Sequence, residues 1–270
     1  MTTMATATQS SRPQALGAAR TLIYFAIPAL LLFLGVHGVM PWFNERWGTP
    51  PFYGYFAGVG VPLAGLLLAS LVALRLEGQT MTWPAVRQRF RLRAMERSAW
   101  LWTLATIVAA FVLTGVFTAL NGALLARDLI SAPAWLPAFL APAGAQMQGG
   151  SLLAIYDAAF GGLAGNWGGA LLYLLLLFFN IVGEEFWWRG YILPRQEAAL
   201  GQWAWLIHGL LWWGFHAFKW WDLLPILPVT LLISYLAQRT QNTTPAIISH
   251  AVFNGMALIP LLLAVAGVIR

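Results

Sequence analysis

The sequence has little charge: Asp, Glu, Lys and Arg make up 9% of its 270 residues, whereas 60% are hydrophobic. Soluble domains typically carry about 25% charged residues. So few charges cannot cover a protein surface in water, which excludes a soluble globular domain and leaves lipid as the main surroundings. Cysteine is absent, which excludes disulfides, thiolate metal ligands and a cysteine nucleophile.

Long apolar runs take the place of charge. About 20 mostly apolar residues are needed to cross a bilayer as a helix. We therefore predict an all-α fold, a polytopic transmembrane helix bundle with seven spans, with eight as the alternative count. Gly255 and Pro260 make the last run either one kinked helix or a helix followed by a short re-entrant piece. The expected spans are 21–41, 53–74, 99–121, 167–189, 203–222, 223–238 and 245–268.

The sequence carries 15 Lys and Arg against 9 Asp and Glu, a net charge of +6. In a soluble protein this excess would suggest nucleic acid as a partner, but membrane proteins concentrate Lys and Arg in their cytoplasmic segments. With the N-terminus in the cytoplasm, most basic residues fall on the cytoplasmic side of the expected spans. We predict a multi-pass protein of the cytoplasmic (inner) membrane, surrounded by lipids and without a nucleic-acid partner. The cytoplasmic basic residues are Arg12, Arg20, Arg75, Arg87, Arg89, Arg91, Arg93, Arg97, Arg189, Arg195 and Arg239, and the others are Arg46, Arg127, Lys219 and Arg270.

One basic loop has a second pattern. Within 83–98, the apolar side chains of Trp83, Val86 and Phe90 are interspersed with Arg87, Arg89, Arg91 and Arg93. The segment is either an amphipathic helix that lies on the anionic membrane surface or an ordinary basic cytoplasmic loop.

Ionisable side chains inside spans are costly and usually functional, and two glutamates lie near the end of the fourth span. Each residue turns a helix by about 100°, so Glu185 shares a face with Arg189 and can pair with it. Glu184 points about 100° away from Glu185 and is left unpaired. An unpaired carboxyl in an apolar site can act as a general acid or base, and Asn180, one turn earlier, could orient it. The alternative is that both glutamates share Arg189 at a wet helix end.

Two later spans carry further polar side chains. His216 lies in the fifth span, and His250 and Asn254 project from one face of the last because they are four residues apart. Together with Glu184 they could hold and activate a water and stabilise an oxyanion. The alternative for His250 and Asn254 is an interhelical hydrogen bond that only holds the bundle together. Of the remaining histidines, we expect a packing or interfacial role for His208 and a structural role for His37.

The expected depths of these residues differ. At about 1.5 Å per residue, Glu184 lies roughly 8 Å from Arg189, at the cytoplasmic end of its span. His216 lies about 20 Å from Trp203, at the cytoplasmic end of the next span, and is therefore deeper. For the two side chains to meet, the fifth helix must tilt or enter the membrane nearer Ile207.

Three motifs now stand in order along the second half of the chain: Glu184-Glu185-x-x-x-Arg189, Trp212-x-x-x-His216 and His250-x-x-x-Asn254. In order and spacing they resemble the CPBP family, which comprises the CAAX-type prenyl-protein endopeptidases and bacterial relatives linked to bacteriocin immunity. The resemblance covers roughly 167–256, and the N-terminal half matches only as generic spans. Trp212 stands where the family usually has Phe, which keeps an aromatic wall.

The resemblance implies an intramembrane endopeptidase whose site opens to the cytosol and whose substrate is a peptide or a membrane protein. In this family the water would be activated by Glu184 and His216. His250 and Asn254 would support the oxyanion, with Glu185 and Arg189 as the supporting pair. The chain then divides into a cytoplasmic N-terminal tail (1–20), N-terminal transmembrane helices with a basic cytoplasmic loop (21–150) and a CPBP-like catalytic helix bundle (151–270).

A metal site is the nearest alternative mechanism. Glu184, His216 and His250 could bind Zn²⁺ as a metalloprotease does, with two His and one Glu and one position open for water. No His-Glu-x-x-His motif is present, and the mechanism that the resemblance suggests needs no ion. We therefore favour a site without a cofactor.

Other functional classes fit the sequence less well. An aspartyl protease needs two intramembrane aspartates, but Asp128, Asp157 and Asp222 lie in or near the expected outside segments. A serine protease would need a Gly-x-Ser in a span, and a transporter would be supported by inverted repeats; the sequence has neither. A catalytically silent membrane scaffold, or a regulator of a partner membrane protein, stays open as the alternative function.

Overall fold

The computed structural model describes residues 13–143 and 151–269, and within these ranges the chain is helical and contains no strand. The predicted tail 1–20 lies largely outside the described residues. The helices are α1 (Ala18–Leu34), α2 (Met40–Trp47), α3 (Pro51–Tyr55), α4 (Val61–Leu76), α5 (Trp83–Arg89), α6 (Arg97–Leu125), α8 (Leu152–Phe160), α9 (Trp167–Phe178), α10 (Leu193–Leu200), α11 (Ala204–Phe215), α12 (Leu223–Thr240), α13 (Thr244–Asn254) and α14 (Leu258–Val265).

Several of these helices are joined by turns of different width, so that they continue one another. The wider π-type turns are Gly35–Val39, Phe56–Gly60, Phe179–Gly183 and Phe186–Ile192, and the tighter 3₁₀ segments are Ala138–Leu140, Gly201–Trp203 and His216–Asp222.

The helices bear out a multi-span membrane protein, but the number of spans differs from the prediction. Four helical stretches are long and apolar enough to cross a membrane: Ala18–Trp47, Pro51–Leu76, Arg97–Leu125 and Trp167–Thr240. A fifth is added if α13 and α14, which are bent by 51° at their break, count as one span. The predicted count of seven or eight is therefore not confirmed.

The longest stretch explains much of the difference. Trp167–Thr240 has 74 residues, and a straight helix of that length would be about 110 Å long. The chain instead turns at Gly201, where φ is 58°, and at Lys219, whose backbone is not helical. The predicted spans 167–189, 203–222 and 223–238 all lie within this folded stretch.

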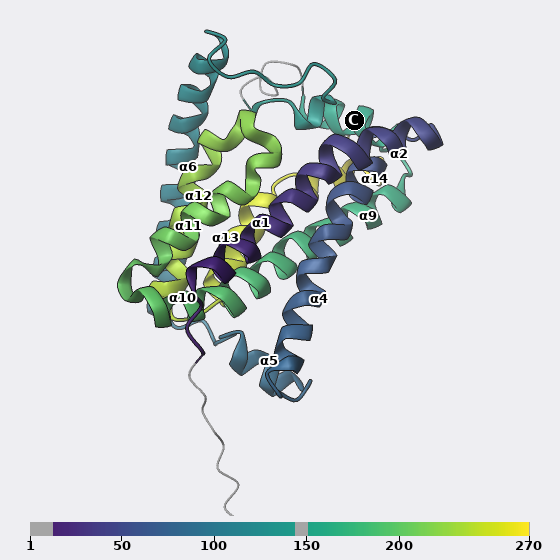
Figure 1. The fold of residues 1–270 in the computed structure, drawn as a ribbon. Coiled ribbons are helices and arrows are strands. Elements are labelled where there is room, and N and C mark those ends of the chain that lie inside the picture. The colour runs from purple at the N-terminus through teal and green to yellow at the C-terminus, as the bar shows by residue number, and fades with distance from the viewer. Residues whose placement is uncertain (1–12, 144–150, 270) are drawn as a thin grey trace, which may run out of the picture.

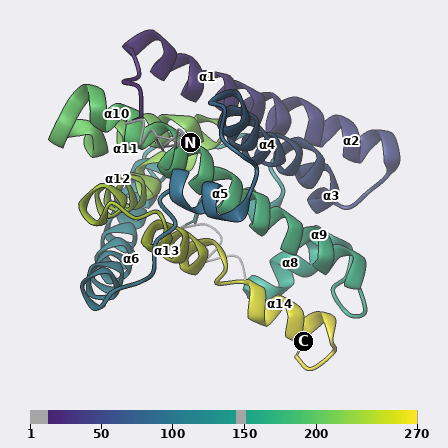
Figure 2. The ribbon, with the colours of Figure 1, turned by 90° about the horizontal axis from the view of Figure 1, so that it is seen from below.

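Figure 1 shows the helices running between two ends of the bundle. α5, α10 and the start of α1 lie at one end, and α2, α8 and α14 lie at the other. Seen from below, α5 lies across the middle of the bundle (Figure 2). We name this first end the arginine end, because α5 and α10 carry Arg87, Arg89 and Arg195, and the segment that follows α5 carries Arg91 and Arg93.

Candidate functional site

The helix that carries the two glutamates is longer than predicted. α9 continues through two π-type turns, Phe179–Gly183 and Phe186–Ile192, into α10, which ends at Leu200. Glu184 therefore lies near the middle of the helical stretch, about 25 Å from either end, rather than near its cytoplasmic end. This removes the difference in depth between Glu184 and His216 that the predicted span ends imply. Single π-type turns inside α-helices often occur at functional sites, and here they flank the two glutamates.

Gly183 allows this helix to approach α4 closely just before Glu184. A Cβ atom at Gly183 would lie 2.7 Å from the carbonyl oxygen of Leu63 on α4. No larger residue fits without a shift of the backbone, so the position of Glu184 is set by direct contact between two helices.

Glu185 and Arg189 form the predicted ion pair. Nη1 of Arg189 donates to Oε1 of Glu185 at 3.0 Å, and both side chains are fully buried. The guanidinium also lies 3.5 Å from the centre of the Trp212 ring, a cation–π contact. Because Arg189 is only 1% exposed, the alternative of a wet helix end does not describe this pair.

Glu184 has three uncharged donors and no cationic hydrogen-bond partner among the described residues. Its Oε1 accepts from Nδ2 of Asn180 at 2.6 Å, and its Oε2 accepts from the indole N–H groups of Trp188 at 3.2 Å and Trp212 at 2.7 Å. The orienting contact from Asn180 is the predicted one. The two tryptophan donors were missed, although Trp188 lies four residues after Glu184 and the i,i+4 spacing could have indicated it.

His250 and Asn254 connect the two glutamates. Nδ1 of His250 lies 2.9 Å from Oε1 of Glu185, and a carboxylate only accepts, so Nδ1 carries the proton. Nε2 of His250 then accepts from the amide of Asn254 at 2.9 Å. The same amide nitrogen donates to Oδ1 of Asn180. The resulting chain of hydrogen bonds runs from Glu185 to Glu184, and the contact of His250 with Glu185 was not predicted.

His216 differs from His250 in having a ring nitrogen without a hydrogen-bond partner in the described part of the chain. Nδ1 donates to the carbonyl oxygen of Trp212 at 2.8 Å, which leaves the lone pair of Nε2 available. The Trp212 ring lies close to both histidines, with ring centres 5.6 Å from His216 and 5.5 Å from His250. His216 is therefore well placed to accept a hydrogen bond from a water in the site.

The two histidines not predicted to be catalytic, His37 and His208, also have defined partners. Nε2 of His37 lies 2.8 Å from the carbonyl oxygen of Phe218, so His37 supports the segment that follows His216. His208 is buried with Nδ1 at 2.6 Å from Oε1 of Gln196. Neither histidine lines the cavity described next.

A cavity of about 490 Å³ contains the site. Its wall includes Glu184, His216, His250 and Asn254, so the structure brings together the four residues predicted to be catalytic. The lining extends to Tyr156 on α8, at the end of the bundle opposite the arginine end, and in the same region includes Phe139, Leu140, Lys219 and Asp222. No described residue of α5 or α10 lines it.

The direction of this cavity is incompatible with one of two predictions, the orientation of the protein or the side on which its site opens. The distribution of basic residues places the arginine end in the cytoplasm, whereas the resemblance implies a site that opens to the cytosol. A cavity whose lining leads away from the arginine end cannot satisfy both.

The geometry does not fit the alternative Zn²⁺ set. Both carboxylate oxygens of Glu184 accept hydrogen bonds, and both ring nitrogens of His250 are engaged. Across residues 13–143 and 151–269, no group of three or more His, Cys, Asp or Glu side chains is arranged to hold a metal ion. A metalloprotease site is therefore not supported by the donor groups present.

The comparison with known families agrees with the motifs. No curated protein and no solved structure matches the chain. Residues 166–256 match the family model described as type II CAAX prenyl endopeptidase Rce1-like. This segment holds all three motifs, and the match confirms the resemblance to the CPBP family of membrane proteases.

Proposed function

We propose that this chain is an intramembrane endopeptidase of the CAAX-protease type that hydrolyses a peptide bond with a water activated by Glu184 and His216. The observation that carries the proposal is the setting of Glu184. Its side chain is 1% exposed, accepts hydrogen bonds from three uncharged donors and lies on the cavity wall. A carboxylate that is held in place by neutral donors keeps its capacity to take up a proton.

The reaction follows from these contacts. A water held between the Glu184 carboxylate and Nε2 of His216 has an acceptor for each of its hydrogens. Glu184 removes one proton while the water oxygen attacks the carbonyl carbon of the peptide bond. The C–N bond then breaks, and the proton passes from Glu184 to the leaving nitrogen.

Asn254 is the proposed donor to the oxyanion. Its amide donates to Asn180 and His250 in this structure. A substrate carbonyl oxygen that takes the place of the Asn180 acceptor receives the same N–H group, which stabilises the negative charge as it develops. His250 fixes the other hydrogen of the amide and is itself held by Glu185, so these two residues and Arg189 position the donor.

The proposal includes the predicted topology of seven spans in the inner membrane with the N-terminus in the cytoplasm. In that topology the substrate enters from the face opposite the cytoplasm, because the cavity lining leads to that end. This arrangement disfavours the location near the cytoplasmic face that the sequence predicts.

The test is cleavage by the purified protein in proteoliposomes. The substrates are synthetic peptides with and without a prenylated C-terminal cysteine, and the variant is Glu184→Gln. We expect cleavage by the wild type and by Glu96→Gln, an exposed acid away from the cavity, and about 10³-fold less cleavage by Glu184→Gln. If the protein is a silent scaffold instead, Glu184→Gln leaves its cellular phenotype unchanged and the wild type cleaves no peptide.

A further inference from the structure

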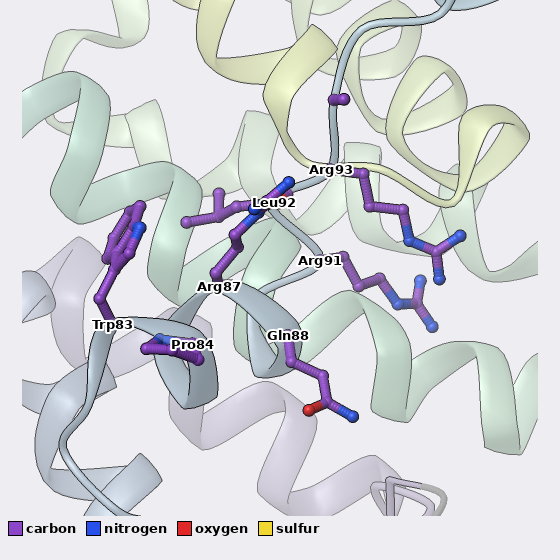
Figure 3. Close-up of a pocket in the computed structure, with 8 residues that line it drawn as sticks. Trp83, Pro84, Arg87, Gln88, Arg91, Leu92 and Arg93 are labelled. Carbon is purple, nitrogen blue, oxygen red and sulfur yellow. Dashed lines mark hydrogen bonds between the residues drawn. The ribbon is translucent and has the colours of Figure 1, made fainter.

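A second pocket lies at the arginine end and shares no lining residue with the catalytic cavity. It has a volume of about 420 Å³. Figure 3 shows Arg87 between Trp83 on one side and Arg91 and Arg93 on the other. The pocket is lined by Trp83, Pro84, Arg87, Gln88, Arg91, Leu92, Arg93 and Ala94.

The charges at this end are only partly neutralised. Glu77 pairs with Arg89 and with Arg195. Glu197 pairs with Arg91 at 2.9 Å. Arg87 and Arg93, which both line the pocket, make no ion pair with a described carboxylate. Two positive charges therefore remain in one pocket for an anionic ligand.

The segment that carries these arginines is held in place before any ligand arrives. Nε of Arg87 donates to the carbonyl oxygen of Leu92 at 3.0 Å, which leaves its terminal nitrogens free for a ligand. The side chain of Asn242, in the connection between α12 and α13, accepts from the backbone N–H of Arg93 at 3.1 Å. Arg91 has a φ of 54°, a conformation that persists in a residue with a side chain only where its surroundings fix it.

We propose that Arg87, Arg93 and Trp83 bind the phosphate headgroup of an anionic phospholipid. Guanidinium groups form paired hydrogen bonds with phosphate oxygens. Trp83 lines the pocket and is 63% exposed, and tryptophan is enriched at the headgroup level of membrane proteins. A free phosphate would use only the arginines, whereas a lipid also contacts the indole ring with its apolar part.

The predicted topology places the pocket beside anionic lipids. If the arginine end faces the cytoplasm, the pocket lies against the leaflet that is rich in anionic lipids. Val86 and Phe90 are buried in one cluster with Leu74 and Phe186, so the apolar side chains of this segment pack on the bundle and hold the pocket in place.

The test measures lipid binding and does not depend on peptidase activity. Delipidated protein in detergent is titrated with phosphatidylglycerol or with phosphatidylcholine, and bound lipid is counted by native mass spectrometry. We expect the wild type to bind phosphatidylglycerol at least tenfold more tightly than phosphatidylcholine. The double variant Arg87→Gln/Arg93→Gln should lose this preference. Arg127→Gln is the control and should keep it, because Arg127 follows the C-terminal end of α6 and does not line the pocket. Arg93→Gln alone serves if the double variant does not fold, because no hydrogen bond or ion pair involves the Arg93 side chain in the described structure.

Three results would overturn the proposal. The first is equal binding of the two lipids by the wild type, and the second is an unchanged preference in Arg93→Gln and in the double variant. The third is a combination of two observations: millimolar inorganic phosphate displaces bound phosphatidylglycerol, and Trp83→Ala binds lipid as tightly as the wild type does. That result would assign the arginines to a soluble phosphate.

Discussion

Two neighbouring regions meet at the paired glutamates, and they are built differently. On the cavity side, Glu184 has uncharged donors and shares an open wall with His216 and Asn254. On the other side, which we name the sealed side, Glu185 lies between Arg189 and His250 and is fully buried. Identical side chains at successive positions therefore have different chemistry, because helix geometry turns one toward the cavity and the other toward a cation.

Removing the charge of Glu184, on the cavity side, should have the largest effect and is the strongest test of this difference between the two glutamates. Glu184→Gln keeps the shape of the side chain but removes the base, and we expect peptide cleavage to fall by about 10³-fold. The unfolding temperature should fall less than in the sealed-side variant below, because no ion pair is lost, although the new amide nitrogen cannot accept from the donor that it faces. Cleavage within tenfold of the wild type would remove Glu184 from the reaction.

The same substitution on the sealed side should act on stability. Glu185→Gln leaves the guanidinium of Arg189 buried without its ion-pair partner, which costs about 3–5 kcal/mol. Oε2 of Glu185 and two nitrogens of Arg189 already lack hydrogen-bond partners among the described atoms, so little is available to compensate. The measurement is thermal unfolding in detergent.

A double variant gives the control for this prediction. Glu185→Gln combined with Arg189→Met removes both members of the pair, and most of the lost stability should return. An unfolding temperature equal to that of the wild type in Glu185→Gln alone would show that the ion pair does not stabilise the sealed side.

A smaller effect is expected from Trp212→Phe, which touches both sides. The substitution keeps an aromatic ring beneath the Arg189 guanidinium but removes the N–H group that donates to Glu184. A hydrogen bond to a charged group is worth about 1.5–3 kcal/mol, so we expect cleavage to fall by about 10- to 100-fold. Trp213→Phe is the matched control, because its indole donates to the carbonyl oxygen of Leu223 instead. Equal activities of the two variants would contradict the role of the Trp212 donor.

The sequence predicts the contacts within one helix and misses those between helices. The pairs Glu185–Arg189, Asn180–Glu184 and His250–Asn254 are each four residues apart, and the helical period brings them together. The contact of His250 with Glu185 depends on how α13 packs against the turns of the fourth predicted span, which no spacing encodes.

Trp212 shows a second kind of miss. From the sequence, Trp212 is expected only to provide an aromatic surface in place of the usual Phe. In the structure its N–H group also donates to Oε2 of Glu184 at 2.7 Å. Which polar atom of a side chain finds a partner is decided by tertiary packing. The sequence also misses the two π-type turns and the continuation of the helix to Leu200. A charged residue such as Arg189 predicts the end of a span, but here Arg189 is buried in its ion pair with Glu185 and the helix continues past it.

Two cysteine substitutions test the direction of the cavity. Before any label is added, they should affect cleavage least of all the variants. Because the chain contains no cysteine, Lys219→Cys and Arg93→Cys each introduce a single reactive thiol. Lys219 lines the cavity at the end opposite the arginine end, whereas Arg93 lies at the arginine end. If the arginine end faces the cytoplasm, a membrane-impermeant maleimide added to intact cells labels the first variant and not the second.

Labelling should also stop cleavage in the Lys219→Cys variant, since a bulky group at that position fills the route to Glu184, while unlabelled protein keeps its activity. The reverse labelling pattern would place the cavity on the cytoplasmic side, and it would then be the predicted orientation of the N-terminus that fails. Labelling of Lys219→Cys without inhibition would mean that peptides reach the glutamate by another path, between the helices from the lipid.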